Sequence, residues 1–141
     1  METVTVNENK NKDSSIHVLL VDDEYNIVFV NKLVLEQMGY VVHSAHSGNE
    51  AIALIEEYRD VIDIIVTDYL MPGMNGVELA VEAGRYLAGT PVILYTGKAE
   101  YIDAKQIAEA GIARVIVKPF KMKDLNIVIR DILHKNEDLS P

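Results

Sequence analysis

The sequence contains no cysteine, so it can form neither a disulfide framework nor a thiolate metal site. No apolar run approaches the ~20 residues that cross a bilayer, and the opening METVTVNENKNKDSS is too polar for a signal peptide. Basic residues are few: 13 Lys and Arg against 22 Asp and Glu give a net charge of -9, which repels phosphate backbones. These absences predict a cytoplasmic protein that binds neither nucleic acid nor membrane directly.

The composition is that of one ordinary globular domain. The 141 residues suffice for a single core but not for two comfortable ones, and 49% of them are apolar, which excludes a wholly disordered chain. Polar, low-complexity sequence is confined to the two ends. We therefore expect a disordered lead-in over residues 1–15, one domain over residues 16–134, and a C-terminal tail over residues 135–141.

Between these ends, short apolar runs alternate with segments of helical periodicity. Nearly continuous apolar runs are typical of strands buried on both faces of a parallel sheet. The runs are Ile16–Val21, Tyr40–Ser44, Ile62–Thr67, Pro91–Tyr95 and Ala113–Val117, and helices are expected over residues 25–38, 48–58, 76–87, 99–110 and 122–134. This alternation predicts a doubly wound, three-layer α/β/α fold around a five-stranded parallel sheet.

Polar side chains directly follow four of the five expected strands. They are Asp22 and Asp23 after the first strand, Asp68 after the third, Thr96 after the fourth and Lys118 after the fifth. The carboxyl ends of parallel strands share one edge of the sheet, and doubly wound folds bind their ligands at that edge. Three acids, one hydroxyl group and one ammonium group are therefore expected to converge there.

Each of these residues has an ordinary structural explanation when taken alone. An aspartate after a strand usually forms a turn or caps a helix, and a lysine there is usually solvated. Together, however, the acids would lie ~5 Å apart, and each like-charge pair costs about 3 kcal/mol at an effective dielectric constant of ~20. The Lys118 ammonium group can offset one charge, and a hard divalent cation such as Mg²⁺ would offset the surplus.

Three segments, in this order, resemble the receiver domain of bacterial two-component response regulators. They are Val18–Glu24 (VLLVDDE), Thr67–Gly76 (TDYLMPGMNG) and Val117–Phe120 (VKPF). The resemblance runs from about Ile16 to Leu133; each segment alone is weakly specific, but the ordered set is highly specific. It implies a flavodoxin-like sheet with the strand order 2-1-3-4-5.

The resemblance implies that Asp68 is a phospho-acceptor. Asp68 would take the phosphoryl group from a phosphohistidine on a sensor histidine kinase or a histidine phosphotransfer protein. The reaction would need Mg²⁺, for which Mn²⁺ can substitute. Asp23, Asp68 and the backbone carbonyl of Leu70 would bind the ion, and Asp22 would act largely through a bound water.

The resemblance also implies a conformational switch. Thr96 would move inward to hydrogen-bond the phosphoryl oxygens, and the Lys118 side chain would pair with them. The peptide bond between Lys118 and Pro119 is expected to be cis, as it usually is in the family. Receiver domains commonly place an aromatic residue, which rotates inward on activation, where this chain has Val115. This departure leaves the switch mechanism open.

Two tyrosines are candidate substitutes for the missing aromatic residue. They are Tyr95 and Tyr101. Tyrosines of this kind usually pack in the core with the hydroxyl group at the surface, and we expect that arrangement for both.

Other functions on the same fold class fit the sequence less well. A protein-interaction module without phosphorylation is the alternative; it would be favoured if an acid or Lys118 were replaced, and none is. A flavodoxin-like cofactor binder needs Ser, Thr and Gly donors in the first loop, where this chain has acids at positions 22–24. A hydrolase is disfavoured because the sequence has no Ser-His arrangement.

The biological context has two interpretations. The chain is expected to be either a stand-alone regulator or a receiver excised from a hybrid histidine kinase, and the similarity of the stretch Thr90–Gly97 to hybrid kinases favours the second. The downstream protein target stays unidentified. By analogy with the family, the face of the fourth and fifth helices is a candidate surface for partners and for a homodimer.

Overall fold

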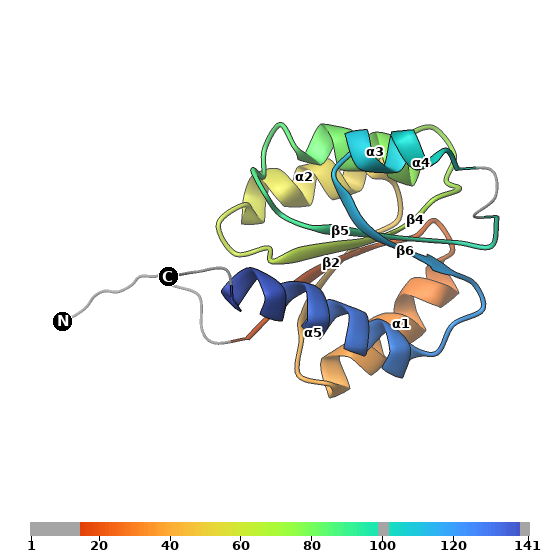
Figure 1. The fold of residues 1–141 in the computed structure, drawn as a ribbon. Coiled ribbons are helices and arrows are strands. Elements are labelled where there is room, and N and C mark those ends of the chain that lie inside the picture. The colour runs from red at the N-terminus through yellow and green to blue at the C-terminus, as the bar shows by residue number, and fades with distance from the viewer. Residues whose placement is uncertain (1–14, 99–101, 139–141) are drawn as a thin grey trace.

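One parallel sheet forms the centre of the molecule. The computed structural model describes residues 15–98 and 102–138 (Figure 1). Over these residues the strands are β2 (His17–Val21), β3 (Val41–Ala45), β4 (Ile64–Asp68), β5 (Val92–Thr96) and β6 (Ile112–Val117). They lie in the order β3-β2-β4-β5-β6, and every pair is parallel, so the strand order 2-1-3-4-5 is confirmed.

Helices cover both faces of the sheet. They are α1 (Tyr25–Gln37), α2 (Gly48–Tyr58), α3 (Gly76–Ala83), α4 (Ala104–Glu109) and α5 (Met122–Asp138). Figure 1 shows α2, α3 and α4 on one face and α1 and α5 on the other, which confirms the expected three-layer α/β/α fold. Within residues 15–98 and 102–138, no helix combines the length and the apolar character needed to cross a membrane.

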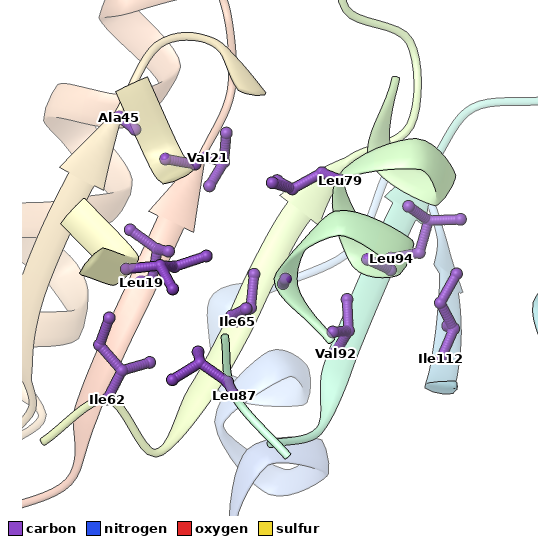
Figure 2. Close-up of a cluster of buried hydrophobic side chains, with 14 of the residues drawn as sticks. Leu19, Val21, Ala45, Ile62, Ile65, Leu79, Leu87, Val92, Leu94 and Ile112 are labelled. Atoms are coloured by element: carbon purple, nitrogen blue, oxygen red, sulfur yellow. The ribbon is translucent and has the colours of Figure 1, made fainter. Parts of the chain in front are cut away.

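The core consists of two clusters, one on each face of the sheet. Successive strand residues point to opposite faces, so Leu19 and Val21 pack under α2 and α3, whereas Val18 and Leu20 pack under α1 and α5. Figure 2 shows the first cluster, in which side chains of β2, β4 and β5 meet Leu79 of α3. The same alternation decides which layer each residue faces at the ends of the strands.

Two helices are shorter than their periodicity predicts. The third helix was expected over residues 76–87 but ends at Ala83, because Gly84 follows as its C-cap and glycine is a poor helix former. The fourth was expected over residues 99–110 but begins at Ala104, where the Asp103 side chain accepts a hydrogen bond of 3.0 Å from the Lys105 amide. Residues 99–101 of the expected helix lie outside the described part of the chain.

The last helix is longer than expected. Its apolar periodicity stops at Leu133, and we predicted an end at residue 134 followed by a tail. The helix instead runs to Asp138, because the polar residues that follow include good helix formers such as Lys135 and Glu137. The predicted lead-in over residues 1–15 falls almost wholly outside the described residues.

The start of α3 is pressed against the end of β4. Asn75 and Glu78 form a reciprocal capping box, each accepting a hydrogen bond of 2.9 Å from the other's backbone amide. A Cβ atom at Gly76 would lie only 2.3 Å from the Asp68 carbonyl oxygen. Glycine at this position therefore lets the helix approach the strand end and fixes the backbone that carries Asp68.

Candidate phospho-acceptor site

Three aspartates from neighbouring strands meet at the carboxyl edge of the sheet. Asp22 and Asp23 follow β2, and Asp68 is the last residue of β4, which lies beside β2. One carboxylate oxygen from each residue lies within 4.8 Å of the other two. Asp22 is 0% exposed and Asp68 is 6% exposed, so water screens these two charges poorly. The fold thus brings together the acids that the sequence places at the strand ends.

Lys118 approaches this cluster from the other side. The residue follows β6, and its backbone amide donates a hydrogen bond of 2.8 Å to the Thr96 carbonyl oxygen. Its Nζ atom lies 3.3 Å from Oδ1 of Asp68, so the two side chains form an ion pair. The expected cis peptide bond between Lys118 and Pro119 is confirmed.

The surroundings of Asp68 raise its pKa. Burial is the largest cause, because it disfavours the charged carboxylate, and the Asp22 carboxylate adds repulsion. The Lys118 ammonium group and the Tyr69 backbone amide act in the opposite direction without outweighing these two causes. The pKa of Asp68 rises from 3.8 to about 6, so at neutral pH this side chain is an anion that the fold alone stabilises incompletely.

This donor set fits a hard divalent cation. Mg²⁺ prefers oxygen ligands and keeps several waters, so one or two carboxylates from the protein are enough to bind it. Three carboxylates lie within 4.8 Å of one another, and the Lys118 ammonium group pairs with Asp68. A cation placed among the three would stabilise the Asp68 carboxylate, which burial and the neighbouring Asp22 charge disfavour. The described residues that could hold Mg²⁺ are therefore Asp22, Asp23 and Asp68.

Two other predicted site residues lie at the same edge. Thr96 is the last residue of β5 and is 1% exposed; it comes one residue after Tyr95, which pairs with Asp68 in the sheet. Its hydroxyl oxygen accepts a hydrogen bond of 3.0 Å from the Lys98 amide. Leu70 lies two residues beyond Asp68, in the loop before α3, with an exposed side chain. The roles given to Thr96 and to the Leu70 carbonyl stay predictions.

Val115 occupies the position where receiver domains commonly have an aromatic residue. It pairs with Leu94 across β5 and β6, is half-buried, and packs against the α2–α3 side of the core. A valine held in this way has no ring that could rotate inward.

Tyr95 is the functional-site residue whose placement the sequence analysis missed. We expected its hydroxyl group at the surface, and that expectation is wrong: the residue is 2% exposed and its hydroxyl donates a hydrogen bond of 2.6 Å to Oδ2 of Asp22. Strand alternation was the available signal, because Tyr95 shares a face with Ile93 and therefore points to the layer that Asp22 faces. Tyr101, the other candidate, lies outside the described residues.

Known proteins resemble this chain in sequence and in fold. Residues 18–130 match the family model of the response regulator receiver domain. The chain is 31% identical over 121 residues to the DNA-binding response regulator MtrA of Mycolicibacterium smegmatis, covering 86% of this chain and 52% of MtrA. It is 33% identical over 123 residues to the sensor kinase CckA of Brucella abortus, covering 87% of this chain and 13% of CckA.

A solved structure has a similar fold. A response regulator receiver domain protein from Clostridium thermocellum superposes with a TM-score of 0.81 at 28% identity, covering 89% of this chain and 99% of that one. By contrast, the chain spans about half the length of MtrA. The likeness to MtrA and CckA therefore concerns a part of each.

Proposed function

This chain belongs to the response regulator receiver family, and from that premise we propose that Asp68 is its phospho-acceptor in a phosphorelay. The observation that carries the proposal is the convergence of Asp22, Asp23 and Asp68 within 4.8 Å, with the Lys118 ammonium group 3.3 Å from Asp68. Phosphoryl transfer depends mainly on alignment and charge neutralisation, which this arrangement supplies. Membership of the family and the geometry of the edge therefore support the same residue.

The proposed reaction transfers a phosphoryl group from a phosphohistidine to Asp68. A carboxylate oxygen of Asp68 attacks the phosphorus, so that a P–O bond forms while the P–N bond breaks. The electron pair of the P–N bond goes to the imidazole nitrogen, which takes up a proton from solvent. Asp68 attacks as an anion, and the ion pair with Lys118 favours that form.

The other edge residues receive the transferred group. Lys118 pairs with the phosphoryl oxygens, and the Thr96 hydroxyl group donates a hydrogen bond to one of them. Asp22, Asp23 and Asp68 would hold Mg²⁺, together with the backbone carbonyl of Leu70. The ion would supply charge neutralisation on the phosphoryl oxygens, and Mn²⁺ would serve in its place. Hydrolysis of the aspartyl phosphate by the domain itself would reset the switch.

The proposed donor is a sensor histidine kinase or a histidine phosphotransfer protein in the cytoplasm. Helix α1 begins two residues after Asp23 and presents large apolar side chains to solvent, among them Tyr25 and Phe29, each 66% exposed. Exposed apolar patches mark protein-interaction sites. A partner helix seated on α1 would bring its phosphohistidine to the adjacent acidic edge. The similarity to the hybrid histidine kinase CckA supports the proposal that this receiver works within such a kinase.

Phosphorylation by a small donor tests the proposal directly. Purified protein is mixed with acetyl phosphate and Mg²⁺, and intact mass spectrometry is expected to detect the gain of one phosphoryl group. Asp68→Asn should lose this gain, and chelation of the metal with EDTA should suppress it.

Asp63→Asn is the matched control, because Asp63 precedes the same strand at its other end. It should be phosphorylated like the unaltered protein. If the unaltered protein gains no phosphoryl group from acetyl phosphate or from any candidate kinase, a phosphorylation-independent interaction module becomes the better explanation. A gain that persists in Asp68→Asn would place the acceptor elsewhere.

A further inference from the structure

Tyr95 connects several components of the acidic edge. Its hydroxyl group donates a hydrogen bond of 2.6 Å to Oδ2 of Asp22 and lies 3.3 Å from the Val21 carbonyl oxygen. The Nζ atom of Lys118 lies 5.0 Å from the centre of its ring, and Phe120 packs edge-on at 5.6 Å. The ring is thus fixed from two sides while the hydroxyl group reaches the metal-binding acids.

The two oxygens of Asp22 are each held by a donor. Oδ1 accepts a hydrogen bond of 3.0 Å from the Glu24 backbone amide, and Oδ2 accepts the short hydrogen bond from Tyr95. An amide donor and a phenol donor on opposite oxygens fix the plane of the carboxylate. Each oxygen keeps a second lone pair for a cation or for a water bound to it.

We propose that Tyr95 is a positioning residue for Mg²⁺, holding the Asp22 carboxylate in the orientation that binds the ion. This inference rests on the proposed function, because it concerns the metal that the phosphoryl transfer needs. Hydrogen-bond partners of metal ligands orient those ligands, and their removal typically costs 10–100-fold in metal affinity. Without the phenol, Oδ2 of Asp22 loses its donor, and metal binding must then order a less constrained carboxylate.

Hydrogen-bonding chemistry sets the direction of this contact. An ionised carboxylate can only accept a hydrogen bond, so the Tyr95 hydroxyl group is the donor to Oδ2 of Asp22.

The test compares two single-hydroxyl deletions. Tyr95→Phe removes the hydroxyl group that contacts Asp22. Tyr40→Phe is the matched control, because Tyr40 is also buried (3% exposed) and its hydroxyl group donates to the Asn126 side chain in α5. Each protein is titrated with MgCl₂, and the dissociation constant is read from the backbone amide resonances of the carboxyl edge.

We expect Tyr95→Phe to raise the Mg²⁺ dissociation constant at least about tenfold, whereas Tyr40→Phe leaves it unchanged. In an Asp22→Asn background, Tyr95→Phe should have little further effect, because the carboxylate on which it acts is gone. A general loss of packing would instead weaken binding equally in both backgrounds. An unchanged dissociation constant in Tyr95→Phe overturns the inference.

A measurement on the unaltered protein covers the case in which Tyr95→Phe fails to fold. With tyrosine labelled at the Cζ carbon, the Tyr95 resonance should shift on Mg²⁺ addition with the same dissociation constant as the edge amides, and the Tyr40 resonance should stay still. If the chemical shift of Tyr95 does not change at saturating Mg²⁺, the inference is overturned but the proposed function stays intact. Unaltered protein that binds no Mg²⁺ at all contradicts both.

Discussion

An aspartate flanks the start of strand β4 and another ends it, and the two side chains differ in burial and in neighbouring charge. Asp63 precedes the strand, is half-buried, and accepts a hydrogen bond of 2.8 Å from the His17 backbone amide. Asp68 ends the strand, is nearly fully buried, and lies among two further carboxylates. The first acid accepts a hydrogen bond from a backbone amide of the neighbouring strand, whereas the second is buried beside the like charge of Asp22.

The comparison distinguishes an acid that stabilises the fold from one that destabilises it. A carboxylate that accepts a backbone hydrogen bond contributes to stability. A buried carboxylate beside like charges costs free energy, and the raised pKa of Asp68 reflects that cost. Charged groups that the protein stabilises incompletely are frequent at functional sites, because a bound ligand can supply the compensating charge.

The largest effect on the function proposed for Asp68 is expected at Lys118. Lys118→Ala removes the ammonium group that pairs with Asp68, and the rate constant of phosphorylation by acetyl phosphate should fall about 10²–10³-fold, as for other charge-stabilising donors. Time-resolved intact mass spectrometry measures this rate. Lys121→Ala, at an exposed lysine three residues further along, should keep the original rate. Equal rates in both variants would mean that the ion pair has no part in the transfer.

The next largest effect is on stability and concerns the packing of α3 against the carboxyl end of β4. Gly76→Ala places a Cβ atom 2.3 Å from the Asp68 carbonyl oxygen and 2.5 Å from the Leu94 side chain. The overpacking should lower the free energy of unfolding by about 3 kcal/mol, measured by urea denaturation. Gly97→Ala is the control, since a Cβ atom there meets nothing within 4 Å. A fully stable Gly76→Ala protein would show that α3 does not fix the strand end.

The smallest effects should have opposite signs at the two ends of the strand. In EDTA at about pH 7.5, Asp68→Asn should raise the free energy of unfolding by about 2 kcal/mol, because it removes a charge that burial and the Asp22 carboxylate disfavour. Asp63→Asn should lower it by about 1 kcal/mol, because it weakens the hydrogen bond to His17. Thermal and urea unfolding measure both changes, and two changes of the same sign would contradict the distinction between the two acids.

The pH dependence of the Asp68→Asn effect follows from the direction of the pKa shift. The folded-state pKa of Asp68 is raised from 3.8 to about 6, so the native state binds this proton more tightly than the unfolded state. The resulting stability is fully present below about pH 4 and is lost as the pH rises through about 6. The advantage of Asp68→Asn should therefore vanish near pH 4, and a constant advantage would exclude titration of Asp68 as its cause.

Much of the fold was predictable because it depends on local patterns. Apolar runs located all five strands to within about two residues, and their alternation with helices predicted the layers. Helix ends were harder, because periodicity gives no signal where a helix continues without apolar residues, as α5 does beyond Leu133. Gly84 shows the opposite error, where one residue ended α3 although apolar residues followed it.

The candidate site was predictable to the extent that it depends on strand ends. Parallel strands deliver their final residues to one edge, so the approach of Asp22, Asp23 and Asp68 followed from their positions alone. The direction of Tyr95 required the register as well: it pairs with Asp68, which places its ring among the acids and not at the surface. That information lies in the pairing of strands, which the sequence of one strand does not contain.

Tyr95 and Thr96 are consecutive residues of β5 whose side chains point to opposite layers of the molecule. A single peptide unit therefore joins the residue that we propose orients Asp22 to the residue that we propose binds a phosphoryl oxygen. A backbone displacement that drew Thr96 inward would therefore also move the point at which the Tyr95 side chain is attached. Such a coupling between the phosphoryl group and the Asp22 carboxylate would need no rotating aromatic ring at Val115.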